Sequence, residues 1–258
     1  MRLVTWNVNS LKARLERVSD WIIEAQPDIL CLQETKMKQD AFPTDHFANL
    51  GYESVHFGTG QWNGVAILSR VGLENPIRGF SAQELAQDEE ARIVSATCGG
   101  IRVVSVYVPN GRSLDDDHYK YKLEWMNRLL HSISGQHSSK DKIAICGDFN
   151  IAPDDIDVYD PKALVGMTHV SEPERNSLKQ LMEWGFKDSF RKFYSSDRLY
   201  SWWDYRGGSF HKGIGMRIDL ILVSLGLADS CLGSLIDRNA RKGQQPSDHA
   251  PVVVELDE

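Results

Sequence analysis

A series of short apolar runs, each broken off by polar residues, constrains the fold of this chain more than any other feature. The continuous run DILCLQE (28–34) is typical of a strand that is covered on both faces. The candidate strands are residues 2–9, 28–34, 52–57, 64–70, 91–98, 101–110, 142–150, 217–224 and 250–256. Strands in this number have to be buried in layers.

Helical periodicity appears between some of these runs. One apolar face is formed by Leu11, Leu15, Val18, Ile22 and Ala25, after a Ser10 cap and before a stop at Pro27. Further helices are expected over 117–133 and 173–184, and Ser171-x-x-Glu174 ahead of the second is a capping box. Some strands follow one another closely and others are separated by helices, which predicts a layered α/β or α+β protein with mixed sheets.

Composition limits the class of protein. The chain has 258 residues, 41% of them apolar and 25% charged, and with no repeat or low-complexity linker we expect one globular domain over 1–258. No signal peptide or membrane-spanning run is visible, so we expect a cytoplasmic location and no membrane contact. The four widely spaced cysteines are expected to be buried free thiols. The net charge of −7 argues against coating nucleic acid by bulk charge, but leaves room for a local basic groove.

Polar side chains stand where the apolar runs end. They are Asn7 and Asn9, Gln33 and Glu34, Tyr107 and Asn110, and Asp148 and Asn150. Strand ends in layered α/β proteins open on a shared crevice, where several segments each deliver a side chain. For GDFN (147–150) alone, a turn explains the Asp and Asn equally well. Asp219 lies inside RIDLIL and would be buried, so it needs a partner, and His249 ahead of the last strand is a candidate.

The residue types in this group indicate a chemistry. Oxygen ligands are offered by Glu34, Asp148, Asp248, Asn7 and Asn150, without a thiolate or a cluster of histidines. Such a set suits Mg²⁺ or Mn²⁺. Together with an imidazole oriented by a carboxylate, a Tyr hydroxyl and amide donors, it matches metal-assisted phosphodiester hydrolysis.

These residues resemble the exonuclease III family of the endonuclease/exonuclease/phosphatase superfamily. The matching motifs run along essentially the whole chain: TWNVNSLKARL, DILCLQETK, WNGVAILSR, YVPNG, GDFNIAP, WWDYRG, GMRIDLILVS and PSDHAPV. The resemblance implies a four-layer α/β sandwich of two mixed β-sheets flanked by helices. It also implies dependence on Mg²⁺, with Mn²⁺ as a substitute, and monomeric action on double-stranded DNA with abasic sites, nicks or 3′-blocked ends.

The same resemblance implies roles for the motif residues. Glu34 becomes the principal metal ligand, assisted by Asp248 and Asn7. Asp148 activates or positions the attacking water, and Asn150 holds the scissile phosphate. His249, oriented by Asp219, donates to a phosphate oxygen, and Tyr107 contacts the phosphate or supports the leaving group. Asn110 and Arg112 meet the DNA backbone. Either Asp148 or His249 takes the proton at this stage.

Two residues depart from the pattern expected of an abasic-site endonuclease. Met216 stands in GMRID where GWRID is common, and His169 stands in GMTHVSEPER where a small residue is expected beside the sugar pocket. Trp202, Trp203 and Phe210 are further candidates for the pocket wall, although aromatic residues in such segments belong to a core at least as often. We expect His169 to narrow the pocket and to favour 3′-phosphate removal and 3′→5′ trimming over internal abasic cleavage. The alternative is a His169 side chain that points to solvent.

Two other functions fit part of the sequence. A phosphodiesterase acting on phospholipid head groups or inositol phosphates is disfavoured by WWDYRG, GMRID and the lack of membrane signals. A DNA-binding protein without catalysis would not need Glu34, Asp148, Asn150, Asp219 and His249 together.

Overall fold

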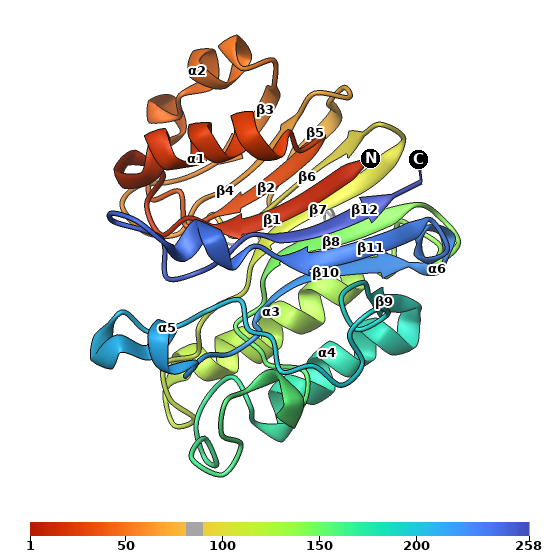
Figure 1. The fold of residues 1–258 in the computed structure, drawn as a ribbon. Coiled ribbons are helices and arrows are strands. Elements are labelled where there is room, and N and C mark those ends of the chain that lie inside the picture. Colours follow the sequence, from red (N-terminus) through yellow and green to blue (C-terminus); the bar gives the residue numbers. More distant parts are fainter. Residues whose placement is uncertain (81–89, 258) are drawn as a thin grey trace.

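Two six-stranded mixed sheets form the centre of the protein (Figure 1). The computed structural model describes residues 1–80 and 90–257. The first sheet has the order β11 (Cys231–Ile236), β12 (Val252–Leu256), β1 (Arg2–Asn7), β2 (Ile29–Gln33), β4 (Val65–Ser69) and β3 (Glu53–Phe57). The second has the order β5 (Glu74–Arg78), β6 (Ile93–Cys98), β7 (Ile101–Tyr107), β8 (Ile143–Asp148), β10 (Asp219–Ser224) and β9 (Phe186–Asp188). Within each sheet one central pair is parallel, β1 with β2 and β7 with β8.

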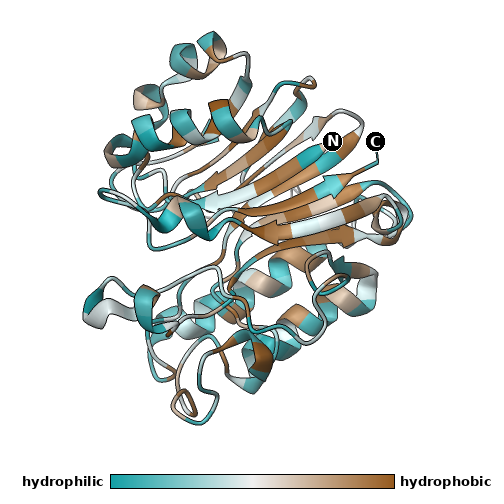
Figure 2. Cartoon of the chain, in the orientation of Figure 1, coloured by the Kyte–Doolittle hydropathy of each residue, from teal (hydrophilic) through white to brown (hydrophobic). Residues whose placement is uncertain are grey.

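Helices cover the outer faces of both sheets and complete four layers (Figure 1). The first sheet packs against α1 (Leu11–Ala25) and α2 (Thr44–Asn49), and the second against α3 (Asp117–Ser134) and α4 (Glu172–Trp184). Short elements are α5 (Ser209–Lys212), α6 (Leu225–Ala228) and the 3-10 turns Gln39–Ala41, Asp155–Asp157, Arg206–Gly208 and Arg238–Arg241. The predicted four-layer α/β sandwich is confirmed, and in Figure 2 its strands form a largely apolar band.

Alternation along the strands explains why a polar site forms at one end of the sandwich. Side chains two residues apart share a face, and in β1 the face toward the second sheet carries Leu3, then Thr5, then Asn7. The same face of β2 changes from Ile29 to Gln33, whose amide donates to Ser105 on β7 across the sheets at 3.2 Å. The space between the sheets is therefore dry at one end and polar at the other.

The predicted helix boundaries agree with the structure, with one exception in how α1 begins. Ser10 has a φ of 87° and its hydroxyl makes no capping hydrogen bond, so the predicted Ser10 side-chain cap is wrong. Its backbone N–H instead donates to the Glu34 carbonyl at 2.8 Å, which ties the start of α1 to the loop after β2. The Ser171 and Glu174 capping box of α4 is present as predicted.

Elements that the periodicity missed are short or irregular. Strand β5 contains Pro76 and is largely exposed, as expected of an edge strand. Strand β11 is also an edge strand, and its register with β12 shifts between Cys231 and Gly233. All four cysteines are buried and free, as predicted. Among the described residues, no helix has both the length and the apolar character needed to cross a membrane.

Candidate active site

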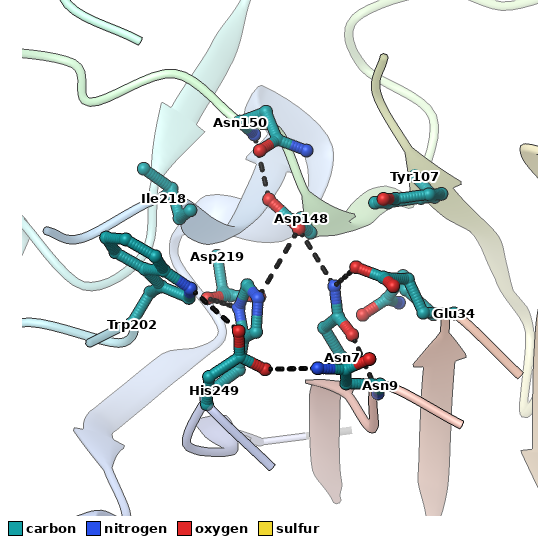
Figure 3. Close-up of polar contacts among 12 residues, drawn as sticks. Asn7, Asn9, Glu34, Tyr107, Asp148, Asn150, Trp202, Ile218, Asp219 and His249 are labelled. Atoms are coloured by element: carbon teal, nitrogen blue, oxygen red, sulfur yellow. Dashed lines mark hydrogen bonds and ion pairs between the residues drawn. The ribbon is translucent and has the colours of Figure 1, made fainter. Parts of the chain in front are cut away.

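The polar residues that end the central strands meet at one place (Figure 3). Asn7 ends β1, and Glu34 directly follows Gln33, its parallel neighbour on β2. Asp148 ends β8, where it lies beside both Tyr107 on β7 and Asp219 on β10. Strand register aligns the residues within each sheet, and the packing of the two sheets brings the two sets together, as the strand-end pattern predicts.

His249 lies between two carboxylates. Its Nδ1 is 2.8 Å from Asp219 Oδ2, and its Nε2 is 3.8 Å from Asp148 Oδ2. Ser201 Oγ also donates to Asp219 Oδ2, at 2.7 Å. Burial works against the charged imidazole, but Asp219 and Asp148 outweigh it and raise the pKa of His249 to about 10. His249 is therefore protonated at neutral pH and acts as a donor.

Asp148 and Glu34 form the acidic side of the site. Asn7 Nδ2 donates to Glu34 Oε1 and to Asp148 Oδ2, at 2.9 Å each, and so bridges the two carboxylates. Burial, followed by the charges of Asp219 and Glu34, raises the pKa of Asp148 to about 7 although His249 opposes the shift. Of the two candidates for taking the proton, Asp148 is the one with a pKa matched to that task.

A cation fits this arrangement. Glu34, Asp148 and His249 each offer a ligand atom within 4.8 Å of the others. Two converging carboxylates, one with a raised pKa, are the electrostatic condition that a bound divalent cation relieves. Because His249 is held as a cation by Asp219, the oxygen ligands are the ones suited to the ion. Asn7 turns its NH₂ group to the carboxylates, so it would have to rotate its amide to offer oxygen.

Asp248 lies beside this group of three and not in it. Its Oδ1 accepts from Asn9 Nδ2 at 2.9 Å and its Oδ2 accepts from Trp202 Nε1 at 3.1 Å. Lys36 Nζ lies 2.6 Å from Asn9 Oδ1 and 2.8 Å from Glu34 Oε2. Both oxygens of Asp248 are thus already hydrogen-bonded, and its role as a metal ligand stays a prediction.

Tyr107 stands across from Glu34 in Figure 3. Burial, with the charges of Glu34 and Asp148, raises the pKa of its phenol well above the ordinary value of 10. The hydroxyl therefore keeps its proton and can donate to an anionic group.

Asn150 connects the acidic centre to a second part of the site, formed by Asn110, Asn150 and His169. Its backbone N–H donates to Asp148 Oδ1 at 2.9 Å, and its Nδ2 donates to the Val108 carbonyl at 3.0 Å. Its Oδ1 accepts from Asn110 Nδ2 at 3.2 Å and lies 3.1 Å from His169 Nε2. The amide of Asn150 is fixed from several sides, which leaves it one orientation.

His169 is part of the site. The half-buried imidazole lies against Asn150, and its Nδ1 is 2.8 Å from the Thr168 hydroxyl, so the alternative of a solvent-facing side chain is wrong. Burial and then the charge of Lys122 lower the pKa of His169 to about 4. The ring is therefore neutral at physiological pH.

A pocket of ≈ 330 Å³ adjoins this second part. Its walls include His169, Leu164, Met167, Trp202 and Met216. Met216 and Trp202 supply apolar surface to this pocket.

Trp203 and Phe210 lie elsewhere, and the prediction that they form the pocket wall is wrong. Trp203 is 1% exposed and packs with Phe210, Tyr200 and Ala250 in a small core of its own. The two rings meet edge to face at 5.1 Å. Their rings pack together in the segment around α5, and neither lines the pocket.

The two residues predicted to contact the DNA backbone lie at the rim of the site. Asn110 is exposed, and the Arg112 side chain is 65% exposed, 3.8 Å from Asp116.

Two residues that sequence reasoning left out of the site are Lys36 and Ser201. Both hold predicted residues in place: Lys36 contacts Glu34 and Asn9, and Ser201 makes two hydrogen bonds with Asp219. Trp202, a predicted candidate for the pocket wall, lines the pocket and also donates to Asp248.

The sandwich and the acidic site together fit a metal-assisted phosphoester hydrolase, and comparison with known proteins indicates a hydrolytic nuclease. Residues 4–249 match the model of the Endonuclease/Exonuclease/phosphatase family, so the chain belongs to this family. It is 33% identical to exodeoxyribonuclease III of Haemophilus influenzae, over 99% of this chain and 100% of that protein.

Two solved structures are similar over 100% of both chains. One is an AP endonuclease from Archaeoglobus fulgidus, with a TM-score of 0.96 and 37% identity. The other is the 3′-5′ exonuclease NExo from Neisseria meningitidis, with a TM-score of 0.95 and 39% identity. NExo from Neisseria is also described as a 3′ phosphatase bound to a product DNA hairpin. Overall identity does not separate the two activities, so the residues of the site have to.

Proposed function

We propose that this protein is a Mg²⁺-dependent DNA-repair phosphodiesterase that acts mainly at 3′ ends, removing 3′-phosphates and trimming 3′→5′. Its substrates would be duplexes with nicks, recessed ends or 3′-blocked ends. Membership of the family and similarity to exodeoxyribonuclease III support the reaction class. The active form would be a monomer.

The donor set supports Mg²⁺, with Mn²⁺ as a substitute. Glu34 would hold the ion, with Asp248 and a rotated Asn7 as further oxygen ligands. When bound, the ion supplies charge stabilisation at the phosphoryl oxygens.

Side chains of the protein would supply the proton transfer and the hydrogen-bond donors. Asp148 takes a proton from water, because its pKa of about 7 leaves it partly ionised and basic at neutral pH. His249 donates to a phosphate oxygen, and Asp219 both orients the ring and keeps it charged. Tyr107 and Asn150 contribute neutral donors, one on each side of Asp148.

The observation that carries the 3′-end preference is the contact between His169 and Asn150. The imidazole lies between the apolar pocket and the amide that would hold the phosphate. An internal abasic site needs room for an extrahelical sugar and for backbone on both sides of it, whereas a terminus ends at the phosphate. Extrusion of a nucleotide involves only a few kcal/mol, so one ring in this position is enough to reverse the preference.

Abasic-site cleavage is the second candidate, and the pocket itself favours it. A cavity of ≈ 330 Å³ walled by Trp202 and Met216 is present beside Asn150. If His169 leaves enough of this space free, an extrahelical sugar enters and abasic cleavage dominates.

The ratio of abasic-site cleavage to 3′-phosphatase turnover decides between the two, measured in wild type and His169→Gly. Residue 169 has a φ of 77°, so glycine keeps the backbone conformation and removes only the ring. Met167→Ala is the matched control, because Met167 lines the same pocket and is 53% exposed. We expect the ratio to rise at least tenfold in His169→Gly alone. An unchanged ratio, or a wild type that already prefers abasic sites, refutes the 3′-end preference.

A further inference from the structure

A fully buried ion pair lies beneath the loops that carry Asn110, Asn150 and His169. Lys122 on α3 and Glu174 on α4 both have 0% exposed side chains, and the Lys122 ammonium donates to Glu174 Oε1. The other carboxylate oxygen, Oε2, accepts from the backbone N–H of Ser171 at 3.1 Å and from its hydroxyl at 2.6 Å. The pair thus joins the two helices that cover the second sheet.

The same pair makes hydrogen bonds to the backbone of all three loops. Lys122 Nζ donates to the carbonyl of Asn150 at 2.7 Å and to the carbonyl of Asn110 at 3.2 Å. Glu174 Oε1 accepts the backbone N–H of His169 at 2.9 Å. One ammonium and one carboxylate therefore fix the backbones of Asn110, Asn150 and His169, whose side chains contact one another above them.

Each of these loops contains a non-glycine residue in the left-handed region. The φ angles are 57° at Arg112, 50° at Asn150 and 77° at His169. Such residues are strained and persist only where their surroundings fix them. At His169 both backbone groups are fixed, since the carbonyl accepts from the Ala152 N–H at 2.8 Å while the N–H goes to Glu174.

Stability alone gives no reason for this pair. A buried ion pair is often no more stabilising than apolar side chains of the same volume, and the neighbouring positions of α4 that face the sheet, Leu178 and Leu181, are apolar. What apolar side chains would not supply is hydrogen bonds to three loops at once.

We propose that Lys122 and Glu174 are specificity-determining positioning residues, which hold His169 over the pocket and against Asn150 so that internal abasic sites are rejected. This inference rests on the proposed 3′-end preference. Neither residue touches substrate. They act through His169 and, more weakly, through Asn110 and Asn150.

The test is the double variant Lys122→Met/Glu174→Gln, which leaves no unpaired buried charge and keeps a partner for Ser171. The readouts are kcat and KM for two duplexes, one with an internal abasic analogue and one with a 3′-phosphate. We expect the ratio of abasic to 3′-phosphatase kcat/KM to rise at least tenfold, chiefly through KM for the abasic duplex. Leu181→Ala is the control, since it weakens the packing of the same helix without touching any of the three loops. A tenfold rise in Leu181→Ala as well would reduce the effect to general loosening and overturn the proposal.

A double-mutant cycle with His169→Gly separates this inference from the function on which it rests. If the pair acts chiefly through His169, the Lys122→Met/Glu174→Gln change has little further effect on the ratio in a His169→Gly background. An effect of equal size in both backgrounds overturns the positioning role. If His169→Gly alone leaves the ratio unchanged, the 3′-end preference itself has failed. If His169→Gly raises the ratio and the double variant does not, only the positioning role has failed.

Should the double variant not fold, Glu174→Asp serves in its place. It keeps both charges but shortens the side chain by one methylene, so the carboxylate cannot reach Lys122, Ser171 and the His169 N–H together. We expect the same rise in the ratio, and an unchanged ratio in folded Glu174→Asp contradicts the proposal.

Discussion

Replacing Asp148 by Asn should stabilise the metal-free protein at alkaline pH while abolishing its activity. The carboxyl is 1% exposed and shares its surroundings with Asp219 and Glu34. Its pKa of about 7 in the folded protein lies above the ordinary value of 3.8. The contribution of the protonated carboxyl to stability is therefore complete below pH 3.8 and is lost as the pH rises through about 7.

The size of the effect follows from these two values. The interval between 3.8 and about 7 corresponds to about 4 kcal/mol, at about 1.4 kcal/mol for each pKa unit. An Asn side chain removes this penalty, but it cannot accept from both the Asn150 N–H and the Asn7 amide. One unmatched donor costs about 1–3 kcal/mol, which leaves a gain of about 1–3 kcal/mol at pH 8.5. At pH 5 the penalty removed is only about 2 kcal/mol, so the difference there is near zero.

Thermal unfolding in chelator, at pH 5 and at pH 8.5, measures this difference. A gain of about 1–3 kcal/mol raises Tm by about 2–10 °C in a protein of this size. Glu174→Gln is the matched control of opposite sign. Burial works to raise the pKa of Glu174, but Lys122 and the hydrogen bonds of the carboxylate lower it overall, so its charge stabilises the fold above the ordinary pKa and this variant should lose stability at pH 8.5. Equal destabilisation of Asp148→Asn at both pH values would show that burial and the neighbouring carboxylates do not raise the pKa of Asp148.

Three further expectations concern the metal, the imidazole and the DNA. A chelator should abolish activity and Mg²⁺ or Mn²⁺ should restore it, with Glu34→Ala needing a higher Mg²⁺ concentration for half-maximal rate; an unchanged titration would place the ion elsewhere. Asp219→Ala and His249→Ala should each lower kcat on the order of 10²-fold, and the double variant should be little worse than either, because the two act as one unit 2.8 Å apart; multiplicative losses would show two independent roles. DNA binding should weaken with added salt, and Arg112→Ala should reduce the slope of log K against log salt by about 1; an identical slope would remove Arg112 from the phosphate contacts.

Much of the active site was predictable because the pairing of strands and the packing of the two sheets place the strand-end side chains together. Asn7, Tyr107, Asp148 and Asp219 lie at the ends of strands whose apolar runs are visible in the sequence. Strand pairing aligns the last three in one sheet, and the packing of the two sheets brings Asn7 to them. Asp219 was predictable for a second reason. A carboxylate between Ile218 and Leu220 had to have a partner, and the partner is His249.

What the sequence did not reveal depends on side-chain direction and on loops. Trp202 and Trp203 are adjacent residues of the same type, yet Trp202 lines the pocket while Trp203 is buried under the α5 segment. Lys122 and Glu174 are 52 residues apart, and nothing in a helical pattern predicts that their charges meet in the interior. Glu174 was visible only as half of a capping box, a role that it also performs.

The most direct test of the proposed function is turnover of the wild-type protein on three end-labelled duplexes in Mg²⁺, with chelator as the blank. One duplex carries an internal abasic analogue, one a 3′-phosphate, and one a plain recessed 3′ end. The position of His169 against Asn150 predicts that the 3′-phosphate and the recessed end are processed at least tenfold faster than the abasic site, and that none is cut in chelator. Faster cleavage at the abasic site, or full activity without metal, would contradict it.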